Sequence, residues 1–359
     1  NPDESLAQAS WDDYIEQGAL KAIAVTREIG GAKQINALGF CVGGTILTNA
    51  NSSAGIFAQS VGGGGGNSTA PISTSLVLGS ASGGAGGTIS VTNMAKITTK
   101  GTAAVGILAQ SVGGGGGVAV SNAAAGQAGL ATLGGSTAQP SANGGTVTIS
   151  SSGAITTSGA NSVGILAQSV GGGGGAVQNG NSYILESAGG TGTSGFVSVY
   201  AYASINASGP GSVAVYTYST SDPLVFVAPG VSVSGGAGGT AVLYDGPSNV
   251  LDNRGSVFTL DGADGMAVRS LSGLTQVDNA GTILGNVRFA PGAGSGLNNL
   301  AGGTLLAGSS LDLGAASNVL SNAGTLASGA SRPPAPCTSE PLMAVVAGRD
   351  APDASVPAL

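Results

Sequence analysis

Short stretches in which apolar and polar residues alternate recur through the middle of the chain. Residues 88–92 (TISVT), 146–150 (TVTIS) and 231–234 (VSVS) place β-branched apolar side chains on one face and small polar side chains on the other. A period of two predicts β-strands with one buried face. Helix formation is disfavoured here because Gly, Ser, Thr and Asn dominate the sequence. The middle of the chain is therefore expected to be all-β.

The same region is an array of longer repeats. GIFAQSVGGGGG at 55–66 returns as GILAQSVGGGGG at 106–117 and at 164–175. Later glycines occupy equivalent positions at steps of 26, 22 and 21 residues: Gly255, Gly281, Gly303 and Gly324. One strand cannot bury enough apolar surface to offset its ordering entropy, whereas stacked coils share one continuous core. The repeats predict a parallel β-helix, or solenoid, of about a dozen turns at roughly 22 residues per turn.

Each pentaglycine run is expected to form a flexible loop or a tight corner, where a backbone without Cβ can take positive φ. The runs satisfy a dinucleotide-binding glycine pattern trivially, and no Lys-Ser or Lys-Thr pair follows them, so they do not indicate nucleotide binding. Gln59, Gln110 and Gln168 precede the three runs at spacings of 51 and 58 residues. Because these spacings exceed one predicted turn, the glutamines are not expected to form a continuous ladder by themselves.

Four tyrosines stand out against the small-residue background. Tyr200 and Tyr202 alternate with small apolar residues, and Tyr216 and Tyr218 repeat the alternation sixteen residues later. If the intervening valines point inward, all four tyrosines point outward on neighbouring strands. Two interpretations stay open: an aromatic contact surface for a glycan or a protein, or cross-strand pairs that only stabilise the sheet.

Composition narrows the chemistry further. The 359 residues include 67 glycines and no histidine, and only 8% are charged. The absence of histidine excludes a Ser-His-Asp or Cys-His pair and any histidine metal site, and no cofactor or metal is predicted. The net charge of -7 argues against nucleic acid as a partner. No apolar stretch is long enough for a membrane-spanning helix.

Charge and proline are unevenly distributed along the chain. Residues 1–47 carry nine of the 27 charged residues, and residues 328–359 carry six of the 14 prolines. The first segment predicts an amphipathic helix over 11–29 and a short strand at 35–40, whereas the last is expected to be disordered or loosely attached. The predicted organisation is an N-terminal fragment (1–47), a repeat array (48–327) and a tail (328–359).

The GI-x-AQS-x-GGGGG units and the later N-x-GT coils resemble the passenger region of large bacterial autotransporters, over about residues 44–327. The resemblance implies a right-handed parallel β-helix at the cell surface or outside the cell, with a structural or adhesive role and no catalytic residues. Its partner would be a glycan or a protein of a host or neighbouring cell. The sequence shows neither an export signal nor an outer-membrane barrel, so a chain produced as written is expected to stay in the cytoplasm.

Cys41 lies in a different pattern, in which a short apolar strand leads into Gly39-Phe40-Cys41-Val42-Gly43. Such a strand and G-x-nucleophile-x-G are typical of a nucleophile elbow, although an apolar cysteine can fall in this pattern by chance. The string NPDESLAQASWDDYIEQGALKAI...INALGFCVGGTIL resembles polyhydroxyalkanoate synthases, enzymes of α/β-hydrolase fold. The resemblance implies that Cys41 occupies the position of the cysteine that carries the growing polyester. Without a histidine to deprotonate it, Cys41 is expected to be an inactive thiol.

The two resemblances meet at residues 43–46 (GGTI). After Gly44 the sequence TILTNANSSAG aligns with ITTKGTAAVG of the repeat array, which suggests that two unrelated reading frames join here. We therefore hypothesise a chimeric gene product. The sequence predicts a non-catalytic surface module, and the alternative is a polyester-forming acyltransferase represented by an inactive fragment.

Overall fold

The computed structural model describes residues 45–68, 76–78, 84–121, 131–133, 142–179, 182–187, 191–292, 294–328 and 342–345. They belong to the second of two compact units, Gly43–Leu359. Apart from one short 3-10 helix, η3 (Gly262–Asp264), the elements described in this unit are β-strands. The helix predicted over 11–29, the strand predicted at 35–40 and Cys41 lie outside the described residues.

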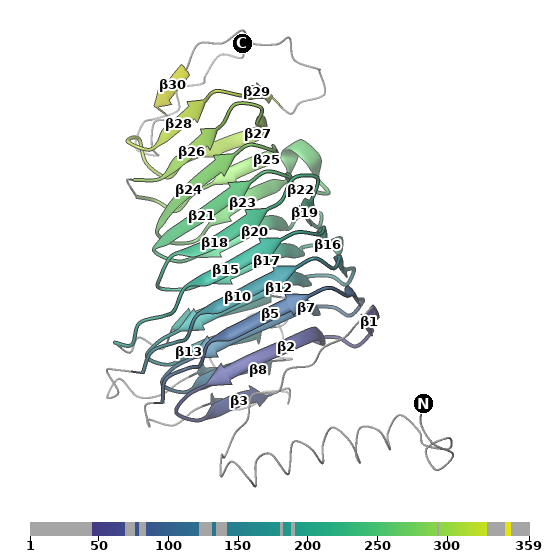
Figure 1. The fold of residues 1–359 in the computed structure, drawn as a ribbon, viewed down its shortest axis with the longest axis vertical. Coiled ribbons are helices and arrows are strands. Elements are labelled where there is room, and N and C mark those ends of the chain that lie inside the picture. Colours follow the sequence, from purple (N-terminus) through teal and green to yellow (C-terminus); the bar gives the residue numbers. More distant parts are fainter. Residues whose placement is uncertain are drawn as a thin grey trace. The chain divides into compact units, whose positions relative to one another are not determined.

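A nine-stranded sheet forms one face of this unit, and Figure 1 shows its strands lying one above another. In sheet order the strands are β5 (Ile89–Asn93), β10 (Val147–Ser151), β15 (Val197–Ala201), β18 (Pro223–Val227), β21 (Ser248–Asn253), β24 (Leu274–Asn279), β26 (Gly296–Asn299), β28 (Val319–Asn322) and β30 (Leu342–Val345). All of these pairings are parallel except that of β30 with β28. Each parallel strand therefore lies in register with a later stretch of the chain.

A fifteen-stranded sheet supplies two further rows of parallel strands, which meet at β25. The first row and its continuation are β1 (Thr45–Thr48), β6 (Lys96–Thr99), β11 (Ile155–Thr157), β16 (Ile205–Ala207), β19 (Ser232–Gly235), β22 (Ser256–Thr259), β25 (Thr282–Arg288), β27 (Thr304–Asp312) and β29 (Thr325–Ser328). The second row is β2 (Ala54–Val61), β7 (Val105–Val112), β12 (Val163–Val170), β17 (Val213–Tyr218), β20 (Thr240–Asp245) and β23 (Met266–Ser270). The sheet is thus nearly closed on itself, and its parallel pairing is compatible with the stacked coils that the repeats predict.

Two small sheets are formed by strands of the N-terminal part of the array. A four-stranded sheet contains β3 (Gly65–Ser68), β8 (Gly116–Ser121), β13 (Gly174–Asn179) and β14 (Ser182–Ser187), and a two-stranded sheet pairs β4 (Leu76–Leu78) with β9 (Ala131–Leu133). The strands β3, β8 and β13 begin within the three pentaglycine runs. The runs therefore lead directly into regular structure.

The alternating sequences bury their apolar face as predicted. In β5 the side chains alternate between buried and exposed, and in β10 they alternate between buried and half-buried. Val147, Ile149 and Val233 are fully buried and belong to one core that continues through successive coils. The residues of this core are mostly Val, Ile, Leu and Ala, which suit a narrow interior between facing strands. The prediction of β-strands with one buried face is confirmed.

The expected coil length is wrong at the N-terminal end of the array. We call the chain between a residue and its pairing partner on the next strand a coil. The first three coils span 51, 58 and 50 residues, whereas later coils span 19 to 28. The long coils each include a pentaglycine run, which carries the chain out to the four-stranded sheet before it returns. Fewer coils than the predicted dozen therefore fill residues 48–327.

The predicted C-terminal tail contains one described strand. β30 pairs antiparallel with β28, from Val319 opposite Val345 to Asn322 opposite Leu342. The sequence there, Leu-Met-Ala-Val, is the apolar part of a proline-rich segment, and β28 offers it the unpaired backbone groups of an edge strand. Within the segment predicted to be disordered or loosely attached, the structure describes residues 328 and 342–345, and the remainder lies outside the described residues.

Candidate functional site

The four candidate tyrosines divide between two sheets. Tyr200 lies on β15 and Tyr202 directly follows it, whereas Tyr216 and Tyr218 lie on β17 in the fifteen-stranded sheet. Tyr202 is 51% exposed, but Tyr216 is only 4% exposed. The prediction that all four point outward on neighbouring strands is wrong. The chain passes through β16 between the two pairs, so the spacing of sixteen residues spans a corner of the coil.

Tyr216 is buried because both faces of β17 are covered. It packs in a second apolar cluster with Leu166 of β12 and Leu185 of β14, a strand of the four-stranded sheet. Burial, followed by the nearby charge of Asp245, raises the pKa of the Tyr216 hydroxyl well above its usual value. Tyr218 packs partly buried against the same cluster. This pair fits the second interpretation of the tyrosines, in which they stabilise the sheet.

Three aromatic residues, the exposed Tyr202 and the half-buried Tyr200 and Phe226, form a group that we call the aromatic cluster. The rings of Tyr200 and Tyr202 are nearly parallel, with an interplanar angle of 8° and centroids 6.4 Å apart. Phe226, on the adjacent strand β18, is tilted against both rings at centroid distances of 6.3 and 5.9 Å. The cluster rests on the sheet because Val197 and Val199, which alternate with these tyrosines, are fully buried on the inner face.

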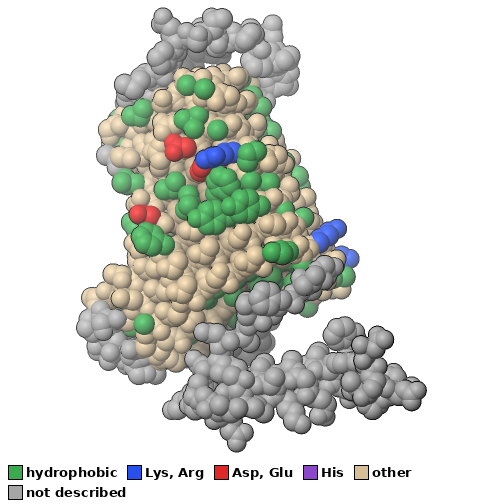
Figure 2. All heavy atoms as spheres, in the orientation of Figure 1, with side chains coloured by type: hydrophobic (Ala, Val, Ile, Leu, Met, Phe, Trp, Pro, Cys, Tyr) green, Lys and Arg blue, Asp and Glu red, His purple; other side chains and the backbone are tan. Residues whose placement is uncertain are grey.

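A charged pair borders the aromatic cluster. The guanidinium carbon of Arg254 lies 5.4 Å from the centre of the Phe226 ring, within the range of a cation–π contact. Arg254 also donates from Nε and Nη2 to the two carboxylate oxygens of Asp252, at 3.2 and 3.0 Å, and this raises the pKa of the guanidinium. Figure 2 shows hydrophobic side chains gathered on this face of the molecule beside basic and acidic ones.

The aromatic cluster continues into a line of polar side chains. Tyr200 pairs in register with Phe226, Phe226 with Asp252, Asp252 with Asp278, and Asp278 with Asn298. We call these five residues the outward row, since they alternate with the buried residues of β15, β18, β21, β24 and β26. Asp278 Oδ1 accepts hydrogen bonds from Asn298 at 2.8 Å and from Gln276 at 3.1 Å.

A glutamine ladder joins the three long coils, contrary to expectation. Gln59 Nε2 donates to Gln110 Oε1, and Gln110 Nε2 donates to Gln168 Oε1, both at 2.7 Å. Gln110 and Gln168 are fully buried, and each also donates to the carbonyl of a pentaglycine, Gly117 or Gly175. The sequence spacings of 51 and 58 residues are the lengths of single coils, so the glutamines are direct neighbours.

An asparagine ladder runs through the shorter coils and was missed by sequence reasoning. Asn253 donates to Asn279, Asn279 to Asn299, and Asn299 to Asn322, at 2.7, 2.7 and 2.6 Å. The available signal was an asparagine two residues before the repeated glycine, as in Asn253 and Asn279. Stacked amides satisfy one another's hydrogen bonds inside the array, and this makes both ladders structural devices.

The pentaglycine runs form tight corners whose glycines are required by close backbone approach. Gly117 has a φ of 140°, and a Cβ there would lie 1.8 Å from the carbonyl oxygen of Gly66 in the preceding coil. Gly175 repeats this geometry against Gly117, at 2.0 Å. Backbone hydrogen bonds such as Gly173 N to Gly113 O, at 2.7 Å, join the runs of successive coils. The pentaglycine runs were predicted to be flexible loops or tight corners, and the structure shows tight corners.

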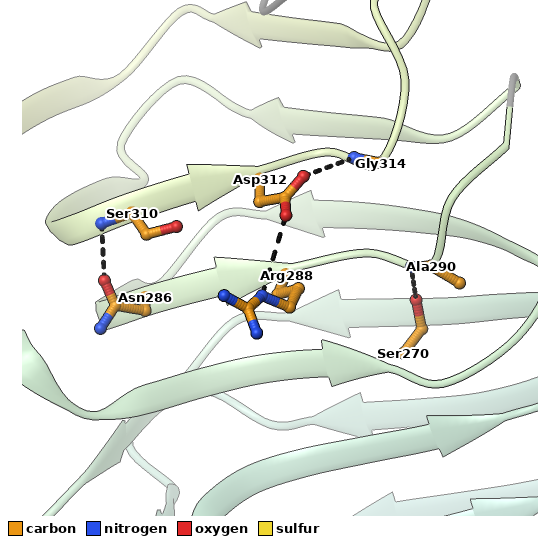
Figure 3. Close-up of polar contacts among 7 residues, drawn as sticks. All are labelled: Ser270, Asn286, Arg288, Ala290, Ser310, Asp312 and Gly314. Atoms are coloured by element: carbon orange, nitrogen blue, oxygen red, sulfur yellow. Dashed lines mark hydrogen bonds and ion pairs between the residues drawn. The ribbon is translucent and has the colours of Figure 1, made fainter. Parts of the chain in front are cut away.

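Polar contacts also hold the last coils where strand pairing becomes irregular. The register of β25 shifts against both β23 and β27. Figure 3 shows Asn286 Oδ1 accepting a hydrogen bond from the Ser310 amide at 2.7 Å, and Arg288 facing Asp312 at 3.8 Å. Both charged side chains are over a third exposed, so the ion pair contributes little to stability. Both contacts join β25 to β27 where the register of the two strands shifts.

Within the described part of the chain, no group of three or more Asp, Glu, Cys or His side chains is arranged to hold a metal ion. No helix among the same residues is both long and apolar enough to cross a membrane. The aromatic cluster and the outward row bring aromatic and polar side chains together on the nine-stranded sheet.

The chain is similar to known proteins over a short segment of its N-terminal region. It is 60% identical over 50 residues to the poly(3-hydroxyalkanoate) polymerase subunit PhaC of Cupriavidus necator, and 38% identical over 47 residues to the subunit of that name from Rhizobium meliloti. These segments cover 14% and 13% of this chain and 8% of each relative. No protein-family model matches the chain, and no solved structure matches it. These two relatives bear out the resemblance of the N-terminal segment to polyhydroxyalkanoate synthases.

Proposed function

We propose that the repeat array is a right-handed parallel β-helix that serves as a non-catalytic structural or adhesive module, of the kind carried to the cell surface by bacterial autotransporters. The observation that carries this proposal is the in-register stacking of like residues. Amides stack on amides in both ladders, and apolar residues stack on apolar residues in the core. Such stacking produces a rigid, extensible body with long outer faces, which is suited to presenting a contact surface.

The face of the nine-stranded sheet is the contact surface in this proposal, and its partner is a glycan or a protein on a host or neighbouring cell. The aromatic cluster supports this choice, since Tyr202 is half exposed and Phe226 and Tyr200 hold it in place. Exposed aromatic groups beside polar side chains are typical of recognition surfaces.

A bead-attachment assay tests the adhesive role. Beads coated with the full chain should attach to cell monolayers more than albumin-coated beads do, and the Tyr200→Ser, Tyr202→Ser double variant should lose most of this attachment. Phe57→Ser is the matched control, because Phe57 is 41% exposed on β2, away from the nine-stranded sheet. Attachment of the native chain at the albumin level, with its β circular dichroism intact, would contradict the adhesive role.

The similarity of the N-terminal region to PhaC favours a second candidate, polyester synthesis by acyl transfer through Cys41. The chain matches 8% of that relative's length, and it contains no histidine that could act as a general base. We propose that this fragment is inactive. Release of coenzyme A from hydroxybutyryl-CoA measures the activity directly, and turnover that disappears in Cys41→Ser would overturn this ranking.

The junction of the two resemblances supports the hypothesis of a chimeric gene product. The PhaC-like segment covers 14% of the chain and lies in its N-terminal region, next to the start of the repeats. Long-read sequencing of the locus provides the test. A single uninterrupted frame that is transcribed and translated would count against the hypothesis.

A further inference from the structure

We infer that the aromatic cluster and the outward row form a binding site for a neutral, extended glycan chain built of hexopyranose units. This inference rests on the proposed adhesive function and names the ligand class of its contact surface. The site consists of Tyr200, Tyr202, Phe226, Asp278 and Asn298, and the Arg254–Asp252 pair lies between its aromatic half and its polar half.

The ring geometry fits the flat faces of sugar rings. Tyr200 and Tyr202 present two nearly parallel rings 6.4 Å apart, and Phe226 braces both from the adjacent strand. A pyranose ring whose hydroxyls are equatorial exposes axial C–H bonds on its faces, and these pack against the electron-rich face of an aromatic ring. Because the rings are held by one another, little side-chain entropy is lost when a ligand stacks on them.

The polar half of the outward row supplies hydrogen-bonding groups along the same line. Strands in a sheet lie about 4.8 Å apart, so successive residues of the row present side chains at that interval along the array. Asp278 uses Oδ1 for Asn298 and Gln276, and its Oδ2 has no partner among the described residues. A sugar hydroxyl is a suitable donor to this oxygen. The row therefore combines stacking at one end with hydroxyl recognition at the other.

The charge of the site selects a neutral ligand. Arg254 is the cation beside the cluster, and both oxygens of Asp252 already engage it. Asp278 adds a negative charge that no described Lys or Arg side chain pairs with. An anionic polysaccharide or an anionic lipid surface would meet net repulsion at the row. A hydroxyl-rich neutral chain avoids that cost and gains a charge-assisted hydrogen bond.

Calorimetric titration of the full chain with cellohexaose, a neutral probe, and with hexagalacturonic acid, an anionic probe, tests the inference. Cellohexaose should bind saturably and hexagalacturonic acid more weakly. Tyr202→Ala removes a stacking ring and should weaken cellohexaose binding about tenfold. Phe57→Ala removes an exposed ring that is distant from the site, and should change the affinity for cellohexaose by less than about twofold. Asp278→Asn should narrow the difference between the two probes because it removes the repelling charge.

Three results would overturn the inference: no saturable binding of cellohexaose, equal affinity in Tyr202→Ala, or equally tight binding of the anionic probe. Failure here is distinguishable from failure of the adhesive function. If coated beads attach to cells through Tyr202 while cellohexaose does not bind, the surface recognises a protein and only the glycan assignment is lost. If cellohexaose binds but coated beads do not attach to cells, the glycan-binding site is supported and the adhesive function is refuted.

Discussion

Replacing the central glutamine of the buried ladder should destabilise the long coils more than replacing the glutamine at its end. Gln110→Met keeps the approximate volume and removes the amide. Gln168 Oε1 and the carbonyl of Gly117 then lose the donors that lie at 2.7 and 3.0 Å. A buried acceptor without a partner costs about 1–3 kcal/mol, so two of them predict a loss of about 2–6 kcal/mol. Gln59→Met removes the donor of one fully buried acceptor, Gln110 Oε1, and a long contact of 3.5 Å to the half-buried Gly66 carbonyl, so it predicts about 1–3 kcal/mol.

Native-state hydrogen exchange is the appropriate assay, because stacked repeats open locally and a single unfolding midpoint averages over the array. Amides of β7 and β12 should exchange faster in Gln110→Met, and those of β24 and β26 should be unchanged. The Gln59→Met variant should affect the same strands by less. Equal exchange in the two variants, or an effect at β7 below about 0.5 kcal/mol, would refute the reasoning that the buried amides stabilise the long coils.

Three further substitutions extend the account. Gly117→Ala should lower the free energy of unfolding in urea by more than Gly66→Ala does. Both glycines have a positive φ that strains an alanine, but only at Gly117 would the Cβ collide with neighbouring backbone. Equal losses of stability in the two variants would contradict the close approach of the backbones at Gly117. Asn279→Asp should be far more destabilising at pH 7 than at pH 4. A buried carboxyl group has a raised pKa, and only its protonated form can donate a hydrogen bond to Asn299. A drop in melting temperature that is the same at both pH values would count against the ladder. Burial raises the pKa of Asp245, so its contribution to stability is fully present at low pH and lost as the pH rises through the folded-state pKa. Asp245→Asn should therefore raise the melting temperature at pH 7 and have little effect near pH 3, and a gain of equal size at both would oppose this cause.

The alternation of residue types was sufficient to predict the strands and their buried faces. Val147 and Ile149 are buried because a period of two leaves them on one side, and this depends only on local geometry. The repeat also indicated which segments are equivalent. It did not give the length of a coil, since the chain between equivalent positions differs from 58 residues in one coil to 20 in another.

Two predictions were wrong because the sequence does not show how long each coil is. Gln59, Gln110 and Gln168 were placed more than one turn apart because a uniform turn was assumed, whereas each long coil includes an excursion to a separate small sheet. The same excursion covers Tyr216 with Leu185, so the local alternation around this tyrosine could not reveal that both of its faces are buried. These features depend on which strands stack outside the main sheets, and that is a property of the whole array.

The central claim is that equivalent repeats lie directly on one another in parallel register. Paired cysteines introduced on the outer face of the nine-stranded sheet test it most directly, in a background with Cys41 and Cys337 replaced by serine. Thr148 and Ser198 are direct partners on β10 and β15, about 4.8 Å apart, whereas Thr148 and Tyr200 are diagonal and about 7–8 Å apart. A short thiol cross-linker should join Thr148→Cys to Ser198→Cys rapidly and Thr148→Cys to Tyr200→Cys slowly. Equal rates for the two pairs, or faster linking of the diagonal pair, would contradict the stacked register.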